Sequence, residues 1–277
     1  MEECVLRLSL KLVATGLLLT ALPGRRTSLA VPPAQEPGAF EDYTEAVPGI
    51  DVSFRMIALH GTDPKVWISQ TEVTWDEYEL FYFGGADEDS TPEIKQRVDA
   101  VSRPTPPYGA PDQGWGTGRR PALSMTLYAA QKYCAWLSAL TGKTYRLPTR
   151  QEWQLACESG SGEEPPLDAM AWSRDNTRRM TMEVGTREPN SLGLQDLLGN
   201  VAEFVAPDRE IQDDPGQRSI PVLGGSYRSR EEELNCSAPQ MVSEKECLVT
   251  DPQVPKSKWW YSDCFHVGFR VVRSGRS

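Results

Sequence analysis

The pattern of apolar and polar residues predicts short elements separated by long irregular stretches. The stretches FRMIALHG, from Phe54, and KVWISQTEVTW, from Lys65, are rich in β-branched and aromatic residues and predict two strands. The following stretch, DEYELFYFG, predicts a short helix that begins near Asp76 and ends before Gly84. FRVVR, close to the C-terminus, predicts the last strand. Residues 85–119 are rich in Gly, Pro and charge, and they predict a long irregular excursion.

The clearest helical pattern lies in SMTLYAAQKYCAWLSALTGK, residues 124–143. Apolar or small side chains recur there at helical spacing, and Gly142 marks the end of the helix. A second helix is predicted by YRLPTRQEWQLACESG, because Thr149 and Glu152 stand in the T-x-x-E relation of a capping box. We find no internal repeat in the sequence.

The N-terminus has the pattern of an export signal. Arg7 and Lys11 precede an apolar run of 11 residues, and Ser28 and Ala30 supply the small residues that precede a cleavage site. The run is too short to span a bilayer, and the alternative is an uncleaved anchor ahead of the domain. The predicted organisation is a signal peptide over residues 1–30, a linker or N-terminal arm over residues 31–48, and one domain over residues 49–277. It implies an extracytoplasmic protein, secreted or periplasmic, with no membrane span after signal cleavage.

Composition narrows the classes of partner. The formal net charge is -10 and the pI is about 4.9, so the chain repels phosphate backbones and anionic membrane surfaces. Nucleic acid is therefore excluded as an expected partner. Hydrophobic residues make up 39% and charged residues 25%, as in an ordinary globular domain, and 22 Gly with 22 Pro favour a loop-rich fold.

The cysteines carry no metal-finger spacing and no CxxC motif. Cys134 and Cys157 each lie on an apolar helix face, where a free cysteine behaves as a small hydrophobic residue. Cys236 and Cys247 are a candidate disulfide. If the signal is cleaved, an odd number of cysteines remains, so at least one thiol is unpaired.

A candidate cation site lies in NSLGLQDLLGNVAEFV, residues 190–205. Asp196, Asn200 and Glu203 are oxygen donors spaced four and three apart, and Gly199 permits a sharp turn between them. Hard cations such as Ca²⁺ bind carboxylate and carbonyl oxygens. The spacing alone favours the simpler alternative, a polar turn that caps a short helix with bonds to backbone amides.

Five stretches, in order along residues 50–273, resemble the motifs of the formylglycine-generating enzyme (sulfatase-modifying factor) family. QTEVTWDEYELF resembles TEVTNxxYxxF, RLPTRQEW resembles RLPTEAEW, and GLQDLLGNVAEFV resembles GLYDMxGNVWEW. VLGGSY resembles RGGSW, and HVGFRVV resembles the GFRxV ending. The resemblance implies a C-type-lectin-like α+β fold, the formylglycine-generating-enzyme fold, which is loop-rich with little regular secondary structure.

The resemblance also implies a calcium site. In family members that bind calcium, the matching stretch supplies two side chains and two backbone carbonyls. The matching positions here are Asp196, Glu203, and the carbonyls of Gly199 and Val201. A second family site would fall near Asp175 and Asn176, where the further ligands do not match.

Copper, by contrast, is not expected. The oxidases of the family hold copper(I) with two cysteines after the GGS motif, and the matching positions here are Ser229 and Leu234. A hydroxyl and an alkyl group cannot replace soft thiolates. Ser226, Tyr227, Ser229 and Cys236 are therefore candidates for a pocket wall or a scaffold loop rather than for catalysis. A three-histidine iron site is excluded because His60 and His266 are the only histidines.

These features predict an exported sulfatase-modifying-factor-like domain without formylglycine-generating activity, a pseudoenzyme that binds a peptide, protein or glycan ligand. The alternative is an O₂- and metal-dependent oxidase that acts on a protein cysteine, with Cys236 in a rearranged site. The sequence names neither the ligand nor the oligomeric state.

Overall fold

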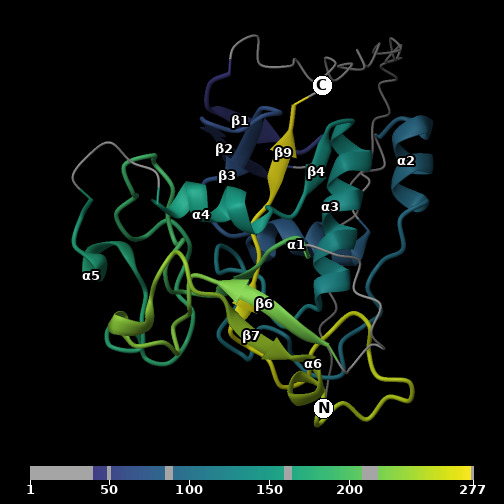
Figure 1. The fold of residues 1–277 in the computed structure, drawn as a ribbon. Coiled ribbons are helices and arrows are strands. Elements are labelled where there is room, and N and C mark those ends of the chain that lie inside the picture. The colour runs from purple at the N-terminus through teal and green to yellow at the C-terminus, as the bar shows by residue number, and fades with distance from the viewer. Residues whose placement is uncertain (1–39, 49–50, 85–89, 159–163, 208–217, 276–277) are drawn as a thin grey trace, which may run out of the picture. The chain divides into compact units, whose positions relative to one another are not determined.

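Two sheets and a set of short helices make up the described part of the chain (Figure 1). The computed structural model describes residues 40–48, 51–84, 90–158, 164–207 and 218–275, all within a unit that spans residues 34–277. The predicted signal peptide, residues 1–30, lies outside the described residues. None of the helices in the described ranges is both long enough and apolar enough to cross a membrane.

The first sheet joins the two ends of the domain. Its strands are β1 (Tyr43–Ala46), β2 (Ser53–Leu59), β3 (Val66–Ser69), β9 (Val272–Ser274) and β4 (Thr144–Arg146), in that spatial order, and all neighbours are antiparallel. Buried β-branched residues meet across it, with Ile57 opposite Ile68 and Ile68 opposite Val272. The C-terminal strand therefore lies between β3 and β4, which are far from it in sequence (Figure 1).

The second sheet positions the motif-bearing loops. Its order is β7 (Gln240–Ser243), β6 (Ser219–Leu223), β5 (Ala202–Phe204) and β8 (Val267–Gly268), and the β5–β8 pair is parallel. Glu203, in the centre of β5, stands opposite Leu223 on one side and Gly268 on the other. β5 thus brings the GNVAEF stretch between the GGSY and GFR stretches.

The predicted helices are present with the expected caps. α1 (Trp75–Phe83) is capped by Thr74 and ends at Gly84 in the left-handed region, and α3 (Leu127–Thr141) ends in the same way at Gly142. α4 (Arg150–Glu158) has the predicted capping box, because Glu152 N donates to Thr149 Oγ1 and Thr149 N donates to Glu152 Oε2. The remaining helical pieces are short: α2 (Pro92–Asp99), α5 (Leu167–Met170), the 3-10 turn η1 (Glu231–Glu233) and α6 (Glu244–Cys247).

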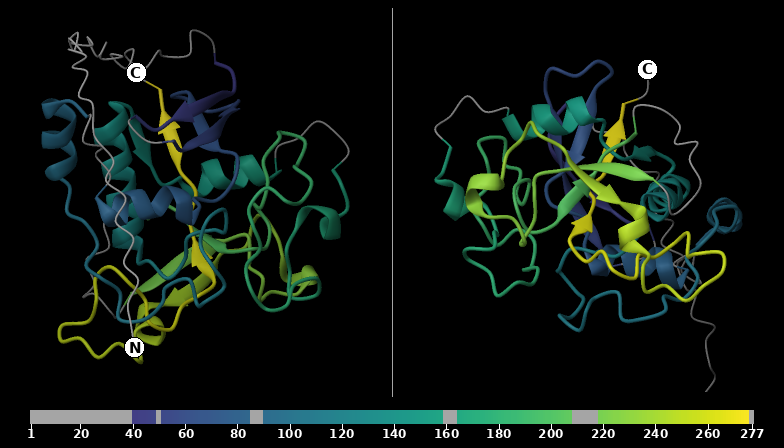
Figure 2. Two further views of the ribbon diagram at one scale, coloured as in Figure 1. Left: turned by 180° about the vertical axis from the view of Figure 1, so that it is seen from behind. Right: turned by 60° about the horizontal axis from the view of Figure 1, so that its bottom comes forward.

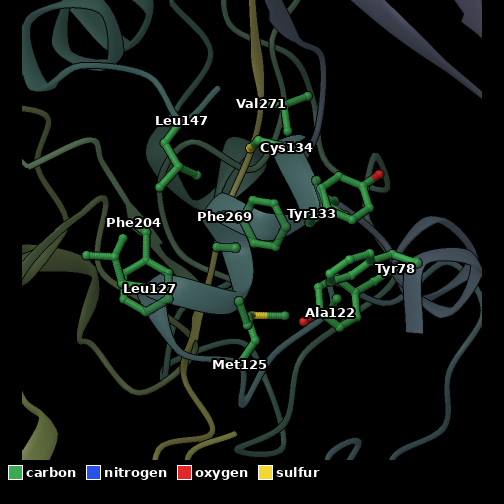
Figure 3. Close-up of a cluster of buried hydrophobic side chains, with 14 of the residues drawn as sticks. Tyr78, Ala122, Met125, Leu127, Tyr133, Cys134, Leu147, Phe204, Phe269 and Val271 are labelled. Carbon is green, nitrogen blue, oxygen red and sulfur yellow. The ribbon is translucent and has the colours of Figure 1, made fainter. Parts of the chain in front are cut away.

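The larger core lies between α3, α1 and the two sheets. Figure 3 shows rings of Tyr78, Tyr133 and Phe269 gathered beside Met125 and Leu127. The Tyr78 and Tyr133 rings are stacked with centroids 5.7 Å apart, and both side chains are almost completely buried. A second core, which includes Ile68, Trp153, Leu197 and Leu223, lies on the α4 side. Aromatic side chains of this size contribute most of the burial free energy of such a core.

Two segments are more regular than the sequence predicts. β1 lies inside the segment predicted as a linker or arm, and it pairs with β2 through Tyr43 opposite Met56. α2 lies inside the excursion predicted as irregular, and it packs against α3 (Figure 2). The α+β, loop-rich class is confirmed, because the described elements are short and long connections join them.

Candidate functional site

The GNVAEF stretch is held in a tight turn between two other segments. Gly199 has a φ of +85°, and a Cβ there would lie 2.3 Å from the carbonyl oxygen of Trp172. Its N–H donates to Gly224 O, and the N–H of Asn200 donates to Trp172 O. Only glycine allows this approach of two backbones, so the turn predicted from the sequence is present.

A cluster of buried charges lies behind this turn. We define the charge cluster as Glu72, Asp196, Glu203 and Arg270, all of them buried. Arg270 Nε and Nη2 donate to the carboxylate of Glu203 at 2.7 Å, and Trp153 Nε1 donates to Glu203 Oε2, also at 2.7 Å. The other guanidinium hydrogens are donated to the backbone carbonyls of Ser69, Gln70 and Gln195. Glu203 is therefore fully engaged in hydrogen bonds.

Glu72 fixes the other side of the turn. Its carboxylate accepts from the N–H of Val201 at 3.0 Å and from Nδ2 of Asn200 at 2.9 Å. Burial raises the pKa of Glu72 well above its ordinary value, and the nearby carboxylates of Asp196 and Glu203 raise it further. Arg270 bonds only Glu203 among the three carboxylates and acts on Glu72 and Asp196 through space, as Arg119 also does on Asp196. Within the cluster as defined, carboxylates outnumber the guanidinium, and the excess negative charge is balanced only if protons, nearby cationic side chains or a cation contribute.

Asp196 is the one carboxylate of the cluster with an unused oxygen. Its Oδ2 accepts from the N–H of Gly185 at 2.6 Å, while the buried Oδ1 has no hydrogen-bond partner among the described residues. Burial raises the pKa of Asp196 to about 6. A buried carboxylate oxygen without a partner is costly, and a bound proton, water or cation would satisfy it.

The predicted calcium ligands fit a cation only in part. Asp196 offers a buried oxygen beside excess negative charge, which suits a hard cation. Glu203 does not offer one, because the Arg270 guanidinium and the Trp153 indole occupy both of its oxygens. Within the described ranges, no three His, Cys, Asp or Glu side chains are grouped to hold a metal. A cation here would therefore depend on backbone carbonyls as well as on Asp196.

The position of the second family calcium site is used for loop contacts. Asn176 Oδ1 accepts from Ser173 N, and its Nδ2 donates to Ala171 O. Asp175 Oδ2 accepts from the N–H of Glu231. Asp175 also lines an open surface hollow together with Leu167, Arg174, Arg230, Glu231 and Glu232.

The GGSY loop, which we define as residues 224–229, is a closed scaffold. Gly224 has a φ of +85°, and a Cβ there would lie 2.2 Å from Leu197 O. The hydroxyl of Ser229 accepts from Ser226 N, and the hydroxyl of Ser226 accepts from Arg228 N, both at 3.2 Å. The sequence candidates Ser226, Tyr227 and Ser229 are all buried. Their hydroxyls are used within the loop or, for Tyr227, by Phe265 O and Arg228.

The structure brings together the two positions that match the copper cysteines. A Cβ on Gly225 would lie 2.6 Å from Leu234 Cδ2 and 3.1 Å from Ser229 Oγ, so both side chains lie against this glycine. The alkyl group of Leu234 and the hydroxyl of Ser229 fill the place where two thiolates would be needed. These residues do not fit a copper(I) ion, which prefers soft thiolate ligands.

The disulfide prediction was wrong. Cys236 is bonded to Cys157, with Cα atoms 5.6 Å apart, and not to Cys247. Cys157 is consequently not a free hydrophobic residue of α4. The helical pattern around Cys157 shows on which face of the helix this residue lies. It does not show that its bonding partner is 79 residues further along the chain. As a disulfide sulfur, Cys236 is also removed from the candidates for metal binding. Cys134, Cys247 and Cys264 are free and buried.

The two histidines have different surroundings. His60 is exposed and its ring contacts Phe40, with centroids 4.9 Å apart. His266 lies beside the GGSY loop, with Nδ1 3.3 Å from Arg228 Nη1 and 3.8 Å from Cys264 Sγ. In these contacts His60 meets Phe40, while His266 meets Arg228 and Cys264, so the two histidines have no partner in common.

Sequence reasoning missed a cavity of about 80 Å³ between two loops that are far apart in sequence. Trp260 Nε1 donates to Thr105 O at 2.7 Å and ties the loops together. Buried Asp251 organises one loop by accepting from Gln253 N and Ser257 N. The wall combines aromatic, proline and uncharged polar residues with this one carboxylate: Pro107, Tyr108, Gly109, Ala110, Pro111, Gln113, Thr250, Asp251, Gln253, Ser257, Trp260, Tyr261, Ser262 and Phe265.

The sequence contains the two stretches that form this cavity, but they lie far apart along the chain. PTPPYGAPDQ, from Pro104, and the stretch around Trp260 each combine proline or aromatic residues with polar ones. Nothing in either stretch specifies that the two pack together, and neither belongs to a recognised motif. Small-molecule and peptide sites commonly have this mixture of flat apolar walls and a few polar groups.

The fold and the arrangement of the five motifs define a formylglycine-generating-enzyme-like protein with a C-type-lectin-like domain. The family described as "Sulfatase-modifying factor enzyme 1-like domain" matches residues 59–275, and the chain belongs to this family. No curated protein matches the chain.

Three solved structures are similar in fold. Treponema denticola variable protein 1 has 19% sequence identity and a TM-score of 0.55, and the match covers 84% of this chain and 99% of that chain. The crystal structure of CarF has 18% identity and a TM-score of 0.52 over 85% and 97% of the two chains. PvdO from Pseudomonas aeruginosa has 21% identity and a TM-score of 0.51 over 84% and 91%. At these identities the likeness concerns the fold alone.

Proposed function

We propose that this protein is an exported, ligand-binding member of the sulfatase-modifying factor family without formylglycine-generating activity. The observation that carries the proposal is the packing of Ser229 and Leu234 against Gly225. A soft two-thiolate site is absent from that place, and the loop hydroxyls are used in internal bonds. An oxidation that depends on such a site has no ligands there.

The cavity supports a binding role. Its lining combines aromatic side chains, hydroxyl and amide side chains, and buried Asp251. Tyr108 lines it and is 73% exposed, so its ring is available for contact with an incoming ligand. At about 80 Å³ the cavity has room for one side chain or sugar substituent, and its mixed lining suits contact with part of a peptide, protein or glycan ligand.

Export is supported by the disulfide as well as by the N-terminal sequence. Disulfides form and persist in oxidising compartments and are rare in the cytosol. The Cys157–Cys236 bond links α4 to the segment after η1.

The alternative oxidase function has lost its proposed sulfur ligand. A rearranged site based on Cys236 needs a thiolate, and this sulfur is bonded to Cys157. Stoichiometric copper or iron in the purified protein would favour an oxidase, whereas calcium alone would favour the binding module.

Calcium as a structural cation is a separate part of this proposal. It is supported by the family resemblance, by the unpartnered Asp196 Oδ1, and by the excess of carboxylates over guanidinium in the charge cluster. Asp196 would hold the ion with backbone carbonyls, and the ion would balance buried charge.

The decisive experiment measures aldehyde formation. Copper-loaded protein is incubated with O₂, a reductant and a Cys-x-Pro-x-Arg peptide, and mass spectrometry follows the thiol. We expect no conversion above a metal-free control. The Ser229→Cys/Leu234→Cys double variant is the matched comparison, and we expect it to gain copper(I) binding because both positions lie against Gly225. Conversion by the unmodified protein would overturn the proposal.

Binding is tested separately with a glycan array and a random-peptide library. We expect retention of a subset of probes, and loss of that retention in Tyr108→Ala. Phe83→Ala is the matched control, since Phe83 is a similarly exposed aromatic residue that does not line the cavity. Equal loss in both variants, or no retained probe, would contradict a binding role for the cavity.

A further inference from the structure

A second pair of cysteines lies at the base of the loop that carries one wall of the cavity. Cys247 is the last residue of α6, and Cys264 lies shortly before β8. The carbonyl oxygen of Cys247 accepts from the N–H groups of Ser262 and Asp263, each at 3.0 Å, so the chain returns to the end of α6 just before Cys264. Both thiols are free and almost completely buried.

The two thiols act on each other. The Cys264 side chain has the largest influence on the pKa of Cys247, and the Cys247 side chain has the largest influence on that of Cys264, so the two lie close together. His266 Nδ1 lies 3.8 Å from Cys264 Sγ. Cys247, together with His266, lowers the pKa of the Cys264 thiol, while Cys264 raises that of Cys247. These directions favour Cys264 over Cys247 as the attacking thiolate in thiol–disulfide exchange.

We propose that Cys247 and Cys264 form a second disulfide when the chain folds in contact with a small-molecule disulfide. The Cys264 thiolate attacks one sulfur of the oxidant and displaces one thiolate. Cys247, deprotonated, then attacks the Cys264 sulfur of the mixed disulfide and displaces the second. The two protein thiols lose two protons and two electrons, and the oxidant is reduced to two thiols.

The third free thiol provides an internal contrast. Cys134 is buried on α3, and its backbone carbonyl accepts from Ser138 Oγ. Burial raises the pKa of the Cys134 thiol, which disfavours the reactive thiolate. No second cysteine is among the groups that shift the pKa of Cys134, whereas Cys247 and Cys264 shift each other's. We therefore expect Cys134 to remain reduced under conditions that oxidise the pair.

The bond would close the loop over residues 248–263. This loop supplies Asp251, Trp260 and Tyr261 to the cavity wall. Closure would hold that wall against the loop of residues 105–113, to which Trp260 is already bonded through Thr105. The proposal concerns the thiol pair and holds whether or not the cavity binds a ligand.

The test is a map of disulfides in the full chain. Protein refolded in oxidised glutathione is denatured without reductant, alkylated, digested and analysed by mass spectrometry. We expect a linked peptide that joins Cys247 to Cys264, intact Cys157–Cys236, and alkylated Cys134. Alkylation of both Cys247 and Cys264 in protein whose Cys157–Cys236 bond is intact would overturn the proposal, and so would linkage of either one to Cys134.

Matched variants separate the pair from general effects of removing a buried thiol. Cys134→Ser and Cys264→Ser each remove one buried sulfur. Only Cys264→Ser is expected to abolish the linked peptide and leave Cys247 alkylated. Persistence of a Cys247 disulfide in Cys264→Ser would contradict the assignment of Cys264. Should Cys264→Ser fail to fold, the map of the unmodified chain decides by itself.

Discussion

The charge cluster is built from residues of the family motifs, whereas the cavity is built from residues outside those motifs. Each residue of the charge cluster lies in a family motif, and its polar groups are consumed by bonds inside the fold, except for Asp196 Oδ1. The cavity is lined by residues outside the motifs, on two loops that leave hydroxyl, amide and aromatic groups facing an opening. The contrast teaches that the recognisable motifs of this chain specify its scaffold, while the cavity that we propose as a binding site is built from residues outside them.

The largest expected effect is the loss of Arg270. Arg270→Met removes the guanidinium that pairs with buried Glu203 and acts through space on Glu72 and Asp196, and we expect a loss of about 3–5 kcal/mol in the free energy of unfolding. Denaturation in urea measures it. Arg55→Met is the control, because the Arg55–Asp42 pair is exposed and should contribute less than about 1 kcal/mol. Similar losses in both variants would show that the charge cluster is not a structural centre.

The next effect concerns the turn beside the cluster. Gly199→Ala combines a left-handed φ with a Cβ 2.3 Å from Trp172 O, and we expect roughly 2–4 kcal/mol of destabilisation. Gly193→Ala is the matched control, since Gly193 has a φ of +87° but no atom within 4 Å of the added Cβ. It should cost about 1 kcal/mol. Equal melting temperatures of the two variants would contradict close backbone packing at Gly199.

A smaller effect is the dependence of stability on pH. The pKa of Asp196 is raised from 3.8 to about 6 on folding, so the folded state binds more protons than the unfolded state in this interval. Its contribution to stability is therefore fully present below pH 3.8 and is lost as the pH rises to about 6. Glu72 acts in the same direction. Asp196→Asn should remove part of this loss, as measured by melting temperature across the interval.

The same measurement tests calcium. If a cation balances the cluster, calcium should raise the melting temperature above about pH 6 by mass action, and chelation should lower it. The response should be weaker below that pH, where a proton on Asp196 competes with the ion. Asp196→Asn should remove most of it. If neither calcium nor a chelator changes the melting temperature at neutral pH, the proposed ion is ruled out.

The smallest effect is expected at the cavity. Tyr108→Ala should change the free energy of unfolding by less than about 0.5 kcal/mol, because the side chain is exposed and lies outside both cores. Urea denaturation measures the change. A large destabilisation would make Tyr108 part of the scaffold and would weaken the contrast with the charge cluster.

Local patterns were enough to predict α1, α3 and α4 but not α2, and the fold class followed from the family resemblance. Thr149 and Glu152 cap α4 because both partners lie within one turn, and the ordered motifs gave the family. The Cys157–Cys236 bond and the cavity were not predicted, because each depends on segments that meet only in the folded chain. The Arg270–Glu203 pair was missed for the same reason: the spacing of Asp196, Asn200 and Glu203 does not reveal a guanidinium from the last motif.

The Cys157–Cys236 bond also closes residues 157–236 into a covalent ring. Asp196, Glu203 and the GGSY loop all lie inside that ring. A protease that cuts the backbone once anywhere between residues 157 and 236 cannot release either piece, so the nicked protein would migrate as one band without reductant and as two with it. In a compartment rich in proteases, the molecule would therefore stay in one piece after a single cut of its backbone in this segment.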